Sequence, residues 1–435
     1  MIERHQLPDG PQARKGVPQI RHVHVLLKRG ETILAQYFPG ILDELRAAGS
    51  NAIDMAGDTR WFHFGGWKPR FQSGMEFYCQ SRPFLEWKIR GRVAATPGVE
   101  ILEGAEARSF VTNASRSRVT GVMIARKSEA GREEAVAADL VVDASGRGSR
   151  TPAWLAALGF PEPEESVIKV DIGYATALVH PPATPARDWK ALFVYMRPPG
   201  TRLGVIVPVE NGMWMVTLVG WFGDHPPSDP AGFVDFARSL PTLELYEAIR
   251  DAEICSPIAI HKFPANRRRR YERLARFPEG LAVIGDALTS FNPIYGQGMT
   301  TAALGASTLE PLPATRAAEA RRRPRPDRLL AALSEAPVAR HRRAVDDGDR
   351  RGFSLRASRG PPSRLDPRAQ LVYRSRLSAR APGRARVAEI PAGHASHETP
   401  GRALRAVRAA PGADAAELAV AAAHRSRAGS RGVSE

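Results

Sequence analysis

The sequence predicts an α/β fold in two parts, with a helix-and-strand unit interrupted by an antiparallel sheet. Two apolar runs, at residues 140–143 and 281–286, end at an acid and lead into glycine turns. In open α/β sheets, such turns lie at the carboxyl ends of strands, where ligands bind. Residues 166–262 instead alternate apolar and polar side chains between turn signals, which favours hairpins. With 435 residues, the chain can hold two or three domains.

The most informative stretch is LAVIGDALTSFNPIYGQGMTTAALGA, residues 281–306. Its first four residues predict a buried strand that delivers Asp286 into a turn. Gly296 and Gly298 would then let backbone amides approach a flat or anionic group at the next helix's N-terminus. The segment therefore predicts a ligand site, although a strand, turn and helix that serve only backbone geometry would carry similar glycines.

Two helices and a series of strands are predicted before this segment. Apolar residues between Ile33 and Leu45 recur at helical spacing, and Gly49 follows as a stop signal. Ser81 and the following proline mark the start of a second helix, residues 81–93, with Leu85, Ile89 and Val93 as its buried stripe. Residues 64–74 have hairpin character, and residues 100–143 read as alternating strands that close on a glycine turn before a further helix.

These motifs together resemble the class A FAD-dependent monooxygenase superfamily, which includes para-hydroxybenzoate hydroxylase and squalene epoxidase. The resemblance implies that Asp286, after Gly285, hydrogen-bonds a ribityl hydroxyl of FAD and that Pro293 lines the flavin. It also implies that loop amides from Gly296 through Gly298 to Met299 face the flavin's pyrimidine edge, where a helix terminus stabilises negative charge.

Further cofactor contacts are implied at the N-terminal side. Glu3, with Arg4 beside it, matches the acid that ends the second strand of a dinucleotide-binding fold and takes the ribose hydroxyls. The stretch RKGVPQIRHVHVLLKRG resembles a polyether-epoxidase-like subgroup, in which the corresponding residues lie along the cofactor. On this basis the candidates are Arg14, Gln19 and His22, together with Arg82 at a helix start and Gly146 in the turn after residue 143.

Two departures from the family pattern limit what it implies. The usual Asp-Gly pair of the middle motif is Ser145-Gly146 here, so no carboxylate role is assigned there. No GxGxxG precedes Glu3, so we expect a truncated Rossmann-like FAD-binding domain without its first βα unit. Because that unit carries the main phosphate site, weak FAD binding or none is expected of the chain as it stands.

The expected domains follow from the same patterns. Residues 1–165 would form the first part of the FAD-binding domain and residues 266–309 its second part. Residues 166–265 would form an antiparallel-sheet substrate domain, with Tyr174, Phe193, Trp214 and Trp221 as possible pocket residues, although sheet-core packing is the simpler expectation for each. Residues 310–435 would be an Arg/Pro/Ala-rich tail, either disordered or translated out of frame, and the family resemblance is expected to stop near residue 309.

Composition supports an enzyme-like body with a basic tail. The chain carries a formal charge of +16, but residues 311–435 hold 26 Arg, no Lys and 12 acids, which leaves +2 for the body. Only two cysteines are present, which excludes a disulfide scaffold, and no metal site is expected. No signal peptide or membrane-length apolar run occurs, so a cytoplasmic location is expected. Nothing in the sequence indicates an oligomeric state.

The implied activity is insertion of one oxygen atom from dioxygen into a small apolar aromatic or alkene substrate, as hydroxylation or epoxidation, with FAD as cofactor and NADPH or NADH as electron donor. No catalytic base can be named, because the flavin carries the chemistry. The alternatives are a non-catalytic fragment that does not retain FAD, a geranylgeranyl-reductase-like flavoprotein and a basic nucleic-acid-binding protein. A tryptophan-type flavin halogenase is disfavoured because the WxWxIP signature is absent.

Overall fold

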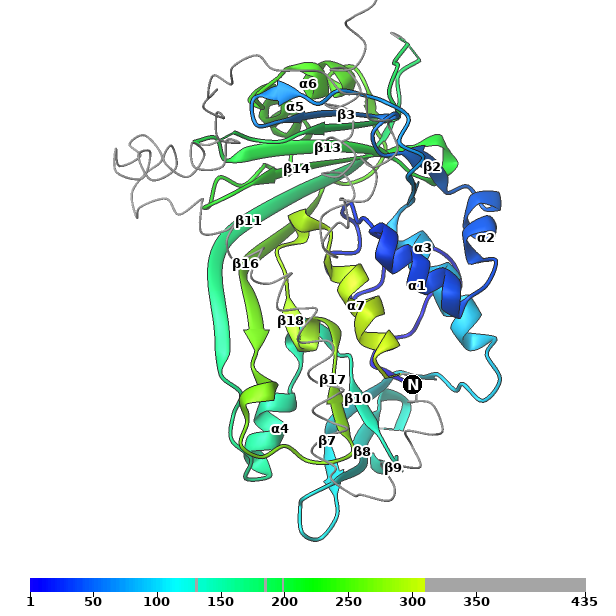
Figure 1. Ribbon diagram of the computed structural model, residues 1–435, viewed down its shortest axis with the longest axis vertical. Helices are drawn as coiled ribbons and strands as arrows, with labels where there is room; N and C mark the ends of the chain where they lie inside the picture. Colours follow the sequence, from blue (N-terminus) through cyan, green and yellow to red (C-terminus); the bar gives the residue numbers. More distant parts are fainter. Residues whose placement is uncertain (130–131, 184–185, 198, 310–435) are drawn as a thin grey trace, which may run out of the picture. The chain divides into compact units, whose positions relative to one another are not determined.

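The computed structural model describes residues 1–309 except 130–131, 184–185 and 198, and the predicted tail, residues 310–435, lies outside the described residues. Figure 1 shows the arrangement of the elements. The described helices are α1 (Lys28–Tyr37), α2 (Ile41–Ala47), α3 (Arg82–Ala94), α4 (Thr151–Ala157), α5 (Pro230–Arg238), α6 (Glu244–Ile249) and α7 (Gly298–Ser307).

The largest sheet has the strand order β18-β16-β11-β14-β13-β12-β3-β4, with β15 also paired to β11. All its pairings are antiparallel except that of β12 with β3. Its strands are β3 (Thr59–His63), β4 (Gly66–Trp67), β11 (Glu165–His180), β12 (Ala191–Val194), β13 (Arg202–Pro208), β14 (Trp214–Gly220), β15 (Glu253–Ile254), β16 (Ala259–Arg269) and β18 (Thr289–Ser290). The sheet therefore extends beyond the predicted segment 166–265, because β3 and β4 join its edge.

Each face of this sheet carries its own apolar cluster. One cluster packs β11, β13 and β14 against α5 and α6, with Phe233 and Leu245 fully buried. The other contains Tyr174, Phe193 and Trp221, and the loop residues Val23, Val25 and Ile294 pack against it. Trp214 belongs to the α5/α6 face, where it stacks on Trp189 at 5.5 Å between ring centroids. It therefore lies on the opposite face from the other three possible pocket residues.

The α/β part contains short parallel and antiparallel pairings. Strand β10 (Val141–Asp143) pairs in parallel with β17 (Leu281–Val283), so the two predicted acid-ended strands are neighbours. The strand β1 (Ile2–Glu3) pairs in parallel with β6 (Leu102–Glu103), and β7 (Ala105–Thr112), β8 (Val119–Arg126) and β9 (Glu133–Ala137) form a meander. The long strands β11 and β16 run from the large sheet toward α4, as Figure 1 shows.

One helix prediction needs correction. The single helix expected from Ile33 to Leu45 is two helices, α1 and α2. Pro39 removes a backbone donor, and Gly40 takes a left-handed φ of 80° that an α-helix cannot contain. The helix predicted at residues 81–93 is present as α3, capped by the Ser81 hydroxyl, but only Leu85 of its predicted stripe is fully buried.

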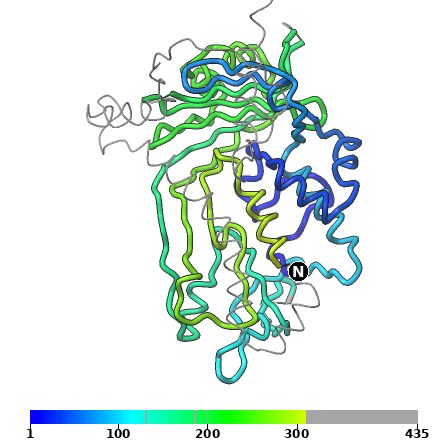
Figure 2. Tube along the Cα trace, in the orientation of Figure 1, coloured from blue at the N-terminus to red at the C-terminus, as the bar shows by residue number. Residues whose placement is uncertain are grey.

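Helix α7 packs closely against α1, as the trace in Figure 2 lets the reader follow. A Cβ added at Gly30 of α1 would lie 2.8 Å from the Thr300 Oγ1 atom and 3.1 Å from the Thr300 Cα atom of α7. No side chain fits at such separations without displacing the backbone of α7. The contact therefore fixes the position of the loop that precedes α7.

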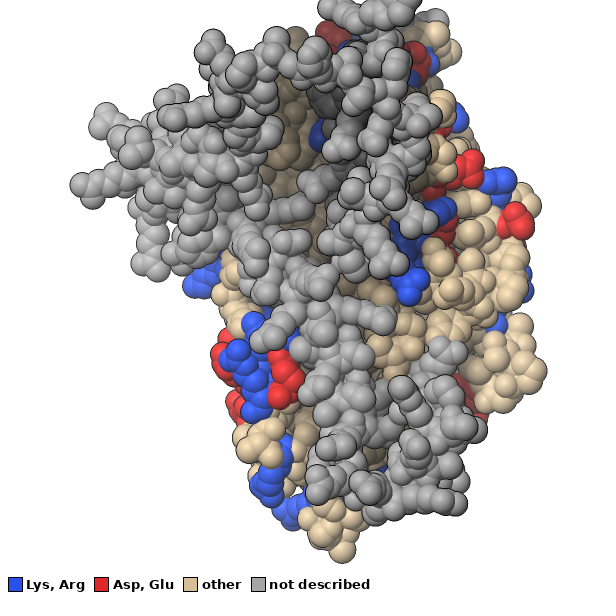
Figure 3. All heavy atoms as spheres, in the orientation of Figure 1, with Lys and Arg blue, Asp and Glu red and all other residues tan. Residues whose placement is uncertain are grey.

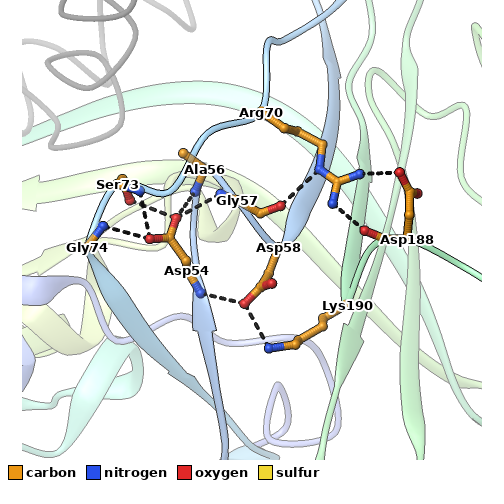
Figure 4. A network of polar contacts seen from close by, with 9 residues as sticks. All are labelled: Asp54, Ala56, Gly57, Asp58, Arg70, Ser73, Gly74, Asp188 and Lys190. Carbon is orange, nitrogen blue, oxygen red and sulfur yellow. Dashed lines mark hydrogen bonds and ion pairs between the residues drawn. The ribbon is translucent and has the colours of Figure 1, made fainter.

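The buried carboxylate of Asp54 holds together the two ends of the segment that contains β3 and β4. This segment connects β2 (Asn51–Asp54) with β5 (Glu76–Cys79). The Asp54 carboxylate accepts hydrogen bonds of 2.7–2.9 Å from the backbone of Ala56, Gly57, Ser73 and Gly74 and from the Ser73 hydroxyl (Figure 4). Burial alone would raise the pKa of Asp54, but these hydrogen bonds hold it below its ordinary value. The network is structural, because every contact is made within the protein.

On the face drawn in Figure 3, the described residues carry charges of both signs. The arginine run at residues 267–270 is also paired with acids: the buried Arg268 pairs with Glu272 at 2.7 Å and the buried Arg269 pairs with Glu165 at 3.0 Å. Such pairing leaves little free positive charge for a polyanion along this run. None of the helices in the described part of the chain is long and apolar enough to span a lipid bilayer.

Candidate functional site

The site is built around the turn that follows β17. Gly285 takes a φ of 60°, which turns the chain away from the sheet and presents Asp286. Within the described residues, no group donates a hydrogen bond to the Asp286 carboxylate. Burial raises the pKa of Asp286, and the nearby guanidinium groups of Arg147 and Arg82 oppose that rise. A half-buried carboxylate to which no described group donates a hydrogen bond is suited to accept one from a ligand hydroxyl.

Glycines leave an open space beside this carboxylate. A Cβ added at Gly146, Gly285 or Gly298 would meet nothing within 4 Å. The described atoms therefore leave room there for a ligand, and α7 begins at Gly298, so its free backbone N–H groups border that room. Gly296 differs, because its φ of 62° ends a short turn and its Cβ position lies 3.5 Å from Val25.

Arg147 is a site residue that the motif reasoning missed. It lies in the turn after β10, donates 2.9 Å hydrogen bonds to the Ala265 carbonyl and the Ser290 hydroxyl, and stacks over Phe263 with its Cζ atom 4.8 Å from the ring centroid. These contacts hold the Arg147 guanidinium at a position where its charge interacts with that of Asp286. The available signal was an arginine between the two glycines of GRG, which a search for a carboxylate passes over.

A chain of ion pairs joins the site to the N-terminus. Arg14 lies 3.1 Å from the Glu3 carboxylate through Nη1 and 2.5 Å from Glu86 through Nε. Glu86 lies 4.0 Å from the Nε atom of Arg82, which is buried and has no hydrogen-bond partner among the described residues. These ion pairs connect four residues in succession: Glu3, Arg14, Glu86 and Arg82. The charge of Arg82 in turn acts on Asp286.

The remaining predicted residues are placed less centrally. Arg4 is exposed and donates to the His5 ring at 3.2 Å, while the Glu3 carboxylate also accepts from the His5 backbone at 2.8 Å. Gln19 is half-buried, and its backbone carbonyl accepts from the His22 amide at 3.1 Å. Pro293 is exposed at the start of the loop before α7, and Met299 packs against the α1–α3 cluster.

The Ser145-Gly146 departure has a local explanation. The Asp143 carboxylate accepts from the Ser145 backbone at 2.9 Å and from the hydroxyls of Ser145, Ser149 and Thr151 at 2.5–2.6 Å. Asp143 thus closes its own turn, and Ser145 points back to it. Gly146 follows in this turn with a φ of 81°, and a Cβ added there would meet no described atom within 4 Å.

The sheet face opposite α5 and α6 carries a buried polar cluster. The His22 Nδ1 atom lies 2.7 Å from the Thr176 hydroxyl on β11, which lies 2.7 Å from the Thr217 hydroxyl on β14. The His22 ring lies 5.7 Å from the His261 ring on β16. Tyr174 donates to the Asn292 Oδ1 atom at 3.1 Å, which links the sheet to the loop before α7. His22 was a sequence candidate, whereas His261 offered no motif by which to find it.

Burial keeps these histidines neutral near pH 7. Burial, with smaller contributions from His261 and His24, lowers the pKa of His22 to about 3. For His24, burial together with the charge of Arg82 lowers the pKa to about 4. The pKa of His261 is also lowered, by burial and by Arg147. The cluster therefore offers neutral hydrogen-bonding groups rather than cations.

Comparison with known proteins decides the family. Residues 71–336, more than half of the chain, match the model of the FAD-binding domain family. The chain belongs to this family. The match runs to residue 336 rather than stopping near residue 309, which corrects the expected end of the resemblance. Protein Rv3254 of Mycobacterium tuberculosis is 35% identical over 320 residues, which cover 71% of this chain and 66% of that protein's length.

Solved structures of flavoproteins share the fold. The chain is similar to pqsL of Pseudomonas aeruginosa, described as a probable FAD-dependent monooxygenase, at a TM-score of 0.56 and 17% identity over 81% of this chain and 88% of that one. It is similar to the flavin-dependent brominase Bmp2 at 0.55 and 14% over 87% and 91%, and to the myxobacterial halogenase CndH at 0.55 and 16% over 87% and 84%. The predicted α/β two-domain flavoprotein fold is confirmed.

The residues present fit an FAD. The open glycine faces, the carboxylate of Asp286 and the N-terminus of α7 offer shape, a hydroxyl acceptor and a positive helix end. Buried polar atoms near them, the Arg82 Nε and the Gln297 Oε1, have no hydrogen-bond partner among the described residues. In a folded protein, such atoms are costly unless a ligand or water completes them.

Proposed function

We propose that this flavoprotein is an FAD-dependent monooxygenase that inserts one atom of dioxygen into a small, largely apolar aromatic or alkene substrate. The single observation that carries the proposal is the apolar sheet face with Tyr174, Phe193 and Trp221. Ile294, from the loop before α7 that would face the flavin, packs against it. An apolar surface next to a flavin loop favours a substrate of the same character, because polar substrates would lose hydration there.

The chain's residues would bind and orient the cofactor. Asp286 would accept a hydrogen bond from a ribityl hydroxyl, while the charges of Arg147 and Arg82 oppose the rise in its pKa that burial causes. The backbone amides that begin α7 would face the flavin's pyrimidine edge and stabilise negative charge there. When bound, FAD supplies the redox chemistry, taking electrons from NADPH or NADH and passing oxygen to the substrate.

The sheet would exclude water from the reacting groups. Phe193 lies in edge contact with Trp61 at 5.8 Å between centroids, and Trp61 meets Tyr195 at 5.6 Å. Such a wall of rings is rigid and apolar, and the exclusion of water protects oxygen transfer from side reactions. Whether the substrate is hydroxylated or epoxidised depends on its own structure.

Oxygen isotope incorporation tests the proposal. The purified chain is incubated under ¹⁸O₂ with FAD, NADPH or NADH, and a panel of aromatic and alkene compounds. The masses of the products are then measured by mass spectrometry. We expect one ¹⁸O atom per product and substrate-stimulated oxidation of the nicotinamide. Hydrogenated alkenes without ¹⁸O would instead favour a reductase of the geranylgeranyl type, and a chain that takes up no flavin would favour a non-catalytic fragment.

A further inference from the structure

His22 carries a buried nitrogen without a partner on the apolar sheet face. Its side chain is only 4% exposed, and its Nε2 atom has no hydrogen-bond partner among the described residues. The His22 ring lies 6.0 Å from the Tyr174 ring and 5.7 Å from the His261 ring, measured between centroids. An unmet buried donor or acceptor destabilises the folded state, so folded proteins retain one mainly where a ligand or water completes it.

The hydrogen bonds behind His22 determine what its Nε2 atom can do. The Thr217 hydroxyl oxygen accepts from the Val23 backbone at 3.4 Å and lies 2.7 Å from the Thr176 hydroxyl. If Thr217 donates to Thr176, and Thr176 donates to the His22 Nδ1 atom, every hydroxyl hydrogen of the chain has an acceptor. The reverse direction would leave the Thr217 hydrogen, 3% exposed, without an acceptor among the described residues.

This direction fixes the tautomer of His22. Because Nδ1 accepts from Thr176, the single proton of the neutral ring lies on Nε2. Burial, with smaller contributions from His261 and His24, lowers the pKa of His22 to about 3 and keeps the ring neutral. The unmet group is therefore a neutral N–H donor, and it calls for an oxygen acceptor.

We propose that the Nε2–H group of His22 donates a hydrogen bond to a hydroxyl or carbonyl oxygen of the substrate. This inference rests on the proposed function and narrows its substrate class to apolar molecules that carry one uncharged oxygen group. His22 would act as a positioning and specificity residue, because a single polar contact on an apolar surface fixes how the substrate lies.

A carboxylate fits this position less well than a neutral oxygen. One N–H donor can serve only one of its two oxygens, and its charge would lose hydration against the apolar cluster. The site therefore discriminates against two kinds of ligand. A ligand without an oxygen leaves the His22 Nε2–H group unpaired, and a carboxylate ligand leaves part of its own charge unpaired.

Three matched probes test the inference by calorimetry, which needs no turnover. The FAD-loaded chain is titrated with naphthalene, 2-naphthol and 2-naphthoate. We expect 2-naphthol to bind about tenfold more tightly than naphthalene, which corresponds to about 1.4 kcal/mol, and 2-naphthoate to bind more weakly than 2-naphthol. Equal affinity for naphthalene and 2-naphthol, or tightest binding of 2-naphthoate, would overturn the inference.

Two variants locate the effect. His22→Phe keeps a ring but removes the donor, so it should abolish the preference for 2-naphthol while naphthalene binds as before. Thr176→Val breaks the hydrogen bond that holds Nδ1 as acceptor, so it should reduce the preference without removing the ring. The matched control is His180→Phe, because His180 is an exposed histidine on β11, the strand that carries Thr176. It should change neither the affinity for 2-naphthol nor that for naphthalene.

The same variants distinguish the substrate from the flavin as the acceptor. If His22 served a flavin carbonyl, His22→Phe would weaken FAD binding and leave the 2-naphthol preference intact, which would contradict the inference. Failure of the proposed function gives a different result, because ¹⁸O incorporation would be absent while the calorimetric preference for 2-naphthol and its loss in His22→Phe persist.

Discussion

Arg147 shows how one side chain can hold the site together. It binds the Ala265 carbonyl and the Ser290 hydroxyl and places a positive charge near Asp286. In Arg147→Met the pKa of Asp286 should rise further, since burial is no longer opposed from this side. FAD binding that needs an ionised Asp286 should then weaken at a higher pH on acidification than in the wild type. Titrating FAD affinity against pH checks this.

The control for that measurement is Arg150→Met, an exposed arginine three positions away. It should leave the pH profile of FAD affinity where it was. Coincident profiles for Arg147→Met and the wild type would show that Arg147 does not act on Asp286.

Asp54 makes a prediction about stability rather than binding. In Asp54→Asn, an amide NH₂ must face either the donors of Ser73 and Gly74 or those of Ala56 and Gly57. We expect a loss of roughly 2–3 kcal/mol in the free energy of unfolding, measured with urea. Because the pKa of Asp54 is lowered in the folded state, its contribution is complete above about pH 4 and is lost as the pH falls further.

The matched control is Asp139→Asn, since Asp139 is exposed. It should change the free energy of unfolding by less than about 0.5 kcal/mol. Equal effects of the two substitutions would contradict the role given to the Asp54 network.

At the scale of elements, a substitution at the start of helix α7 should affect stability and FAD affinity in different ways. Gly298→Ala adds a methyl group in open space, so the folded chain should be unchanged or more stable by up to about 1 kcal/mol. The same methyl group would occupy the room assigned to the flavin, and FAD affinity should fall at least tenfold. Gly91→Ala, in α3 and also open, should stabilise the chain without changing FAD affinity. Equal FAD affinity in both variants would place the cofactor elsewhere.

The sequence could predict elements whose signals are local. The run before Asp286, the cap at Ser81 and the alternating strands of the sheet each follow from short-range patterns, and the structure has them. Gly40 also carries a local signal, but the continuous apolar spacing from Ile33 to Leu45 concealed it. The polar cluster could not be predicted, because the register of β11, β14 and β16 brings Thr176, Thr217 and His261 together, and the loop before α1 places His22 against Thr176.

At the scale of the whole molecule, the buried histidines predict how stability depends on pH. The pKa values of His22 and His24 are lowered to about 3 and about 4, whereas an unfolded chain binds these protons near pH 6.5. The unfolded state therefore holds more protons between these limits, and stability must fall as the pH falls through 6.5. At pH 5 each histidine should cost up to about 2 kcal/mol relative to pH 7.

Urea unfolding from pH 7.5 to pH 4.5 measures this dependence. His22→Gln removes one titrating group and should flatten the slope without abolishing it, because the pKa values of His24 and His261 are also lowered. The control His180→Gln, at an exposed position, should not change the slope. A slope that is the same in all three proteins would show that His22 is protonated as readily in the folded state as in the unfolded chain.

The measurement that tests the central claim most directly is a titration of FAD into the purified chain and its Asp286→Ala variant, followed by flavin fluorescence. If FAD lies beside Asp286, between the turns of Gly146 and Gly285 and the start of α7, quenching should saturate at one FAD per chain. The variant should then bind at least tenfold more weakly with its fold intact by circular dichroism. Unsaturable quenching, or equal affinity in the two proteins, would contradict it.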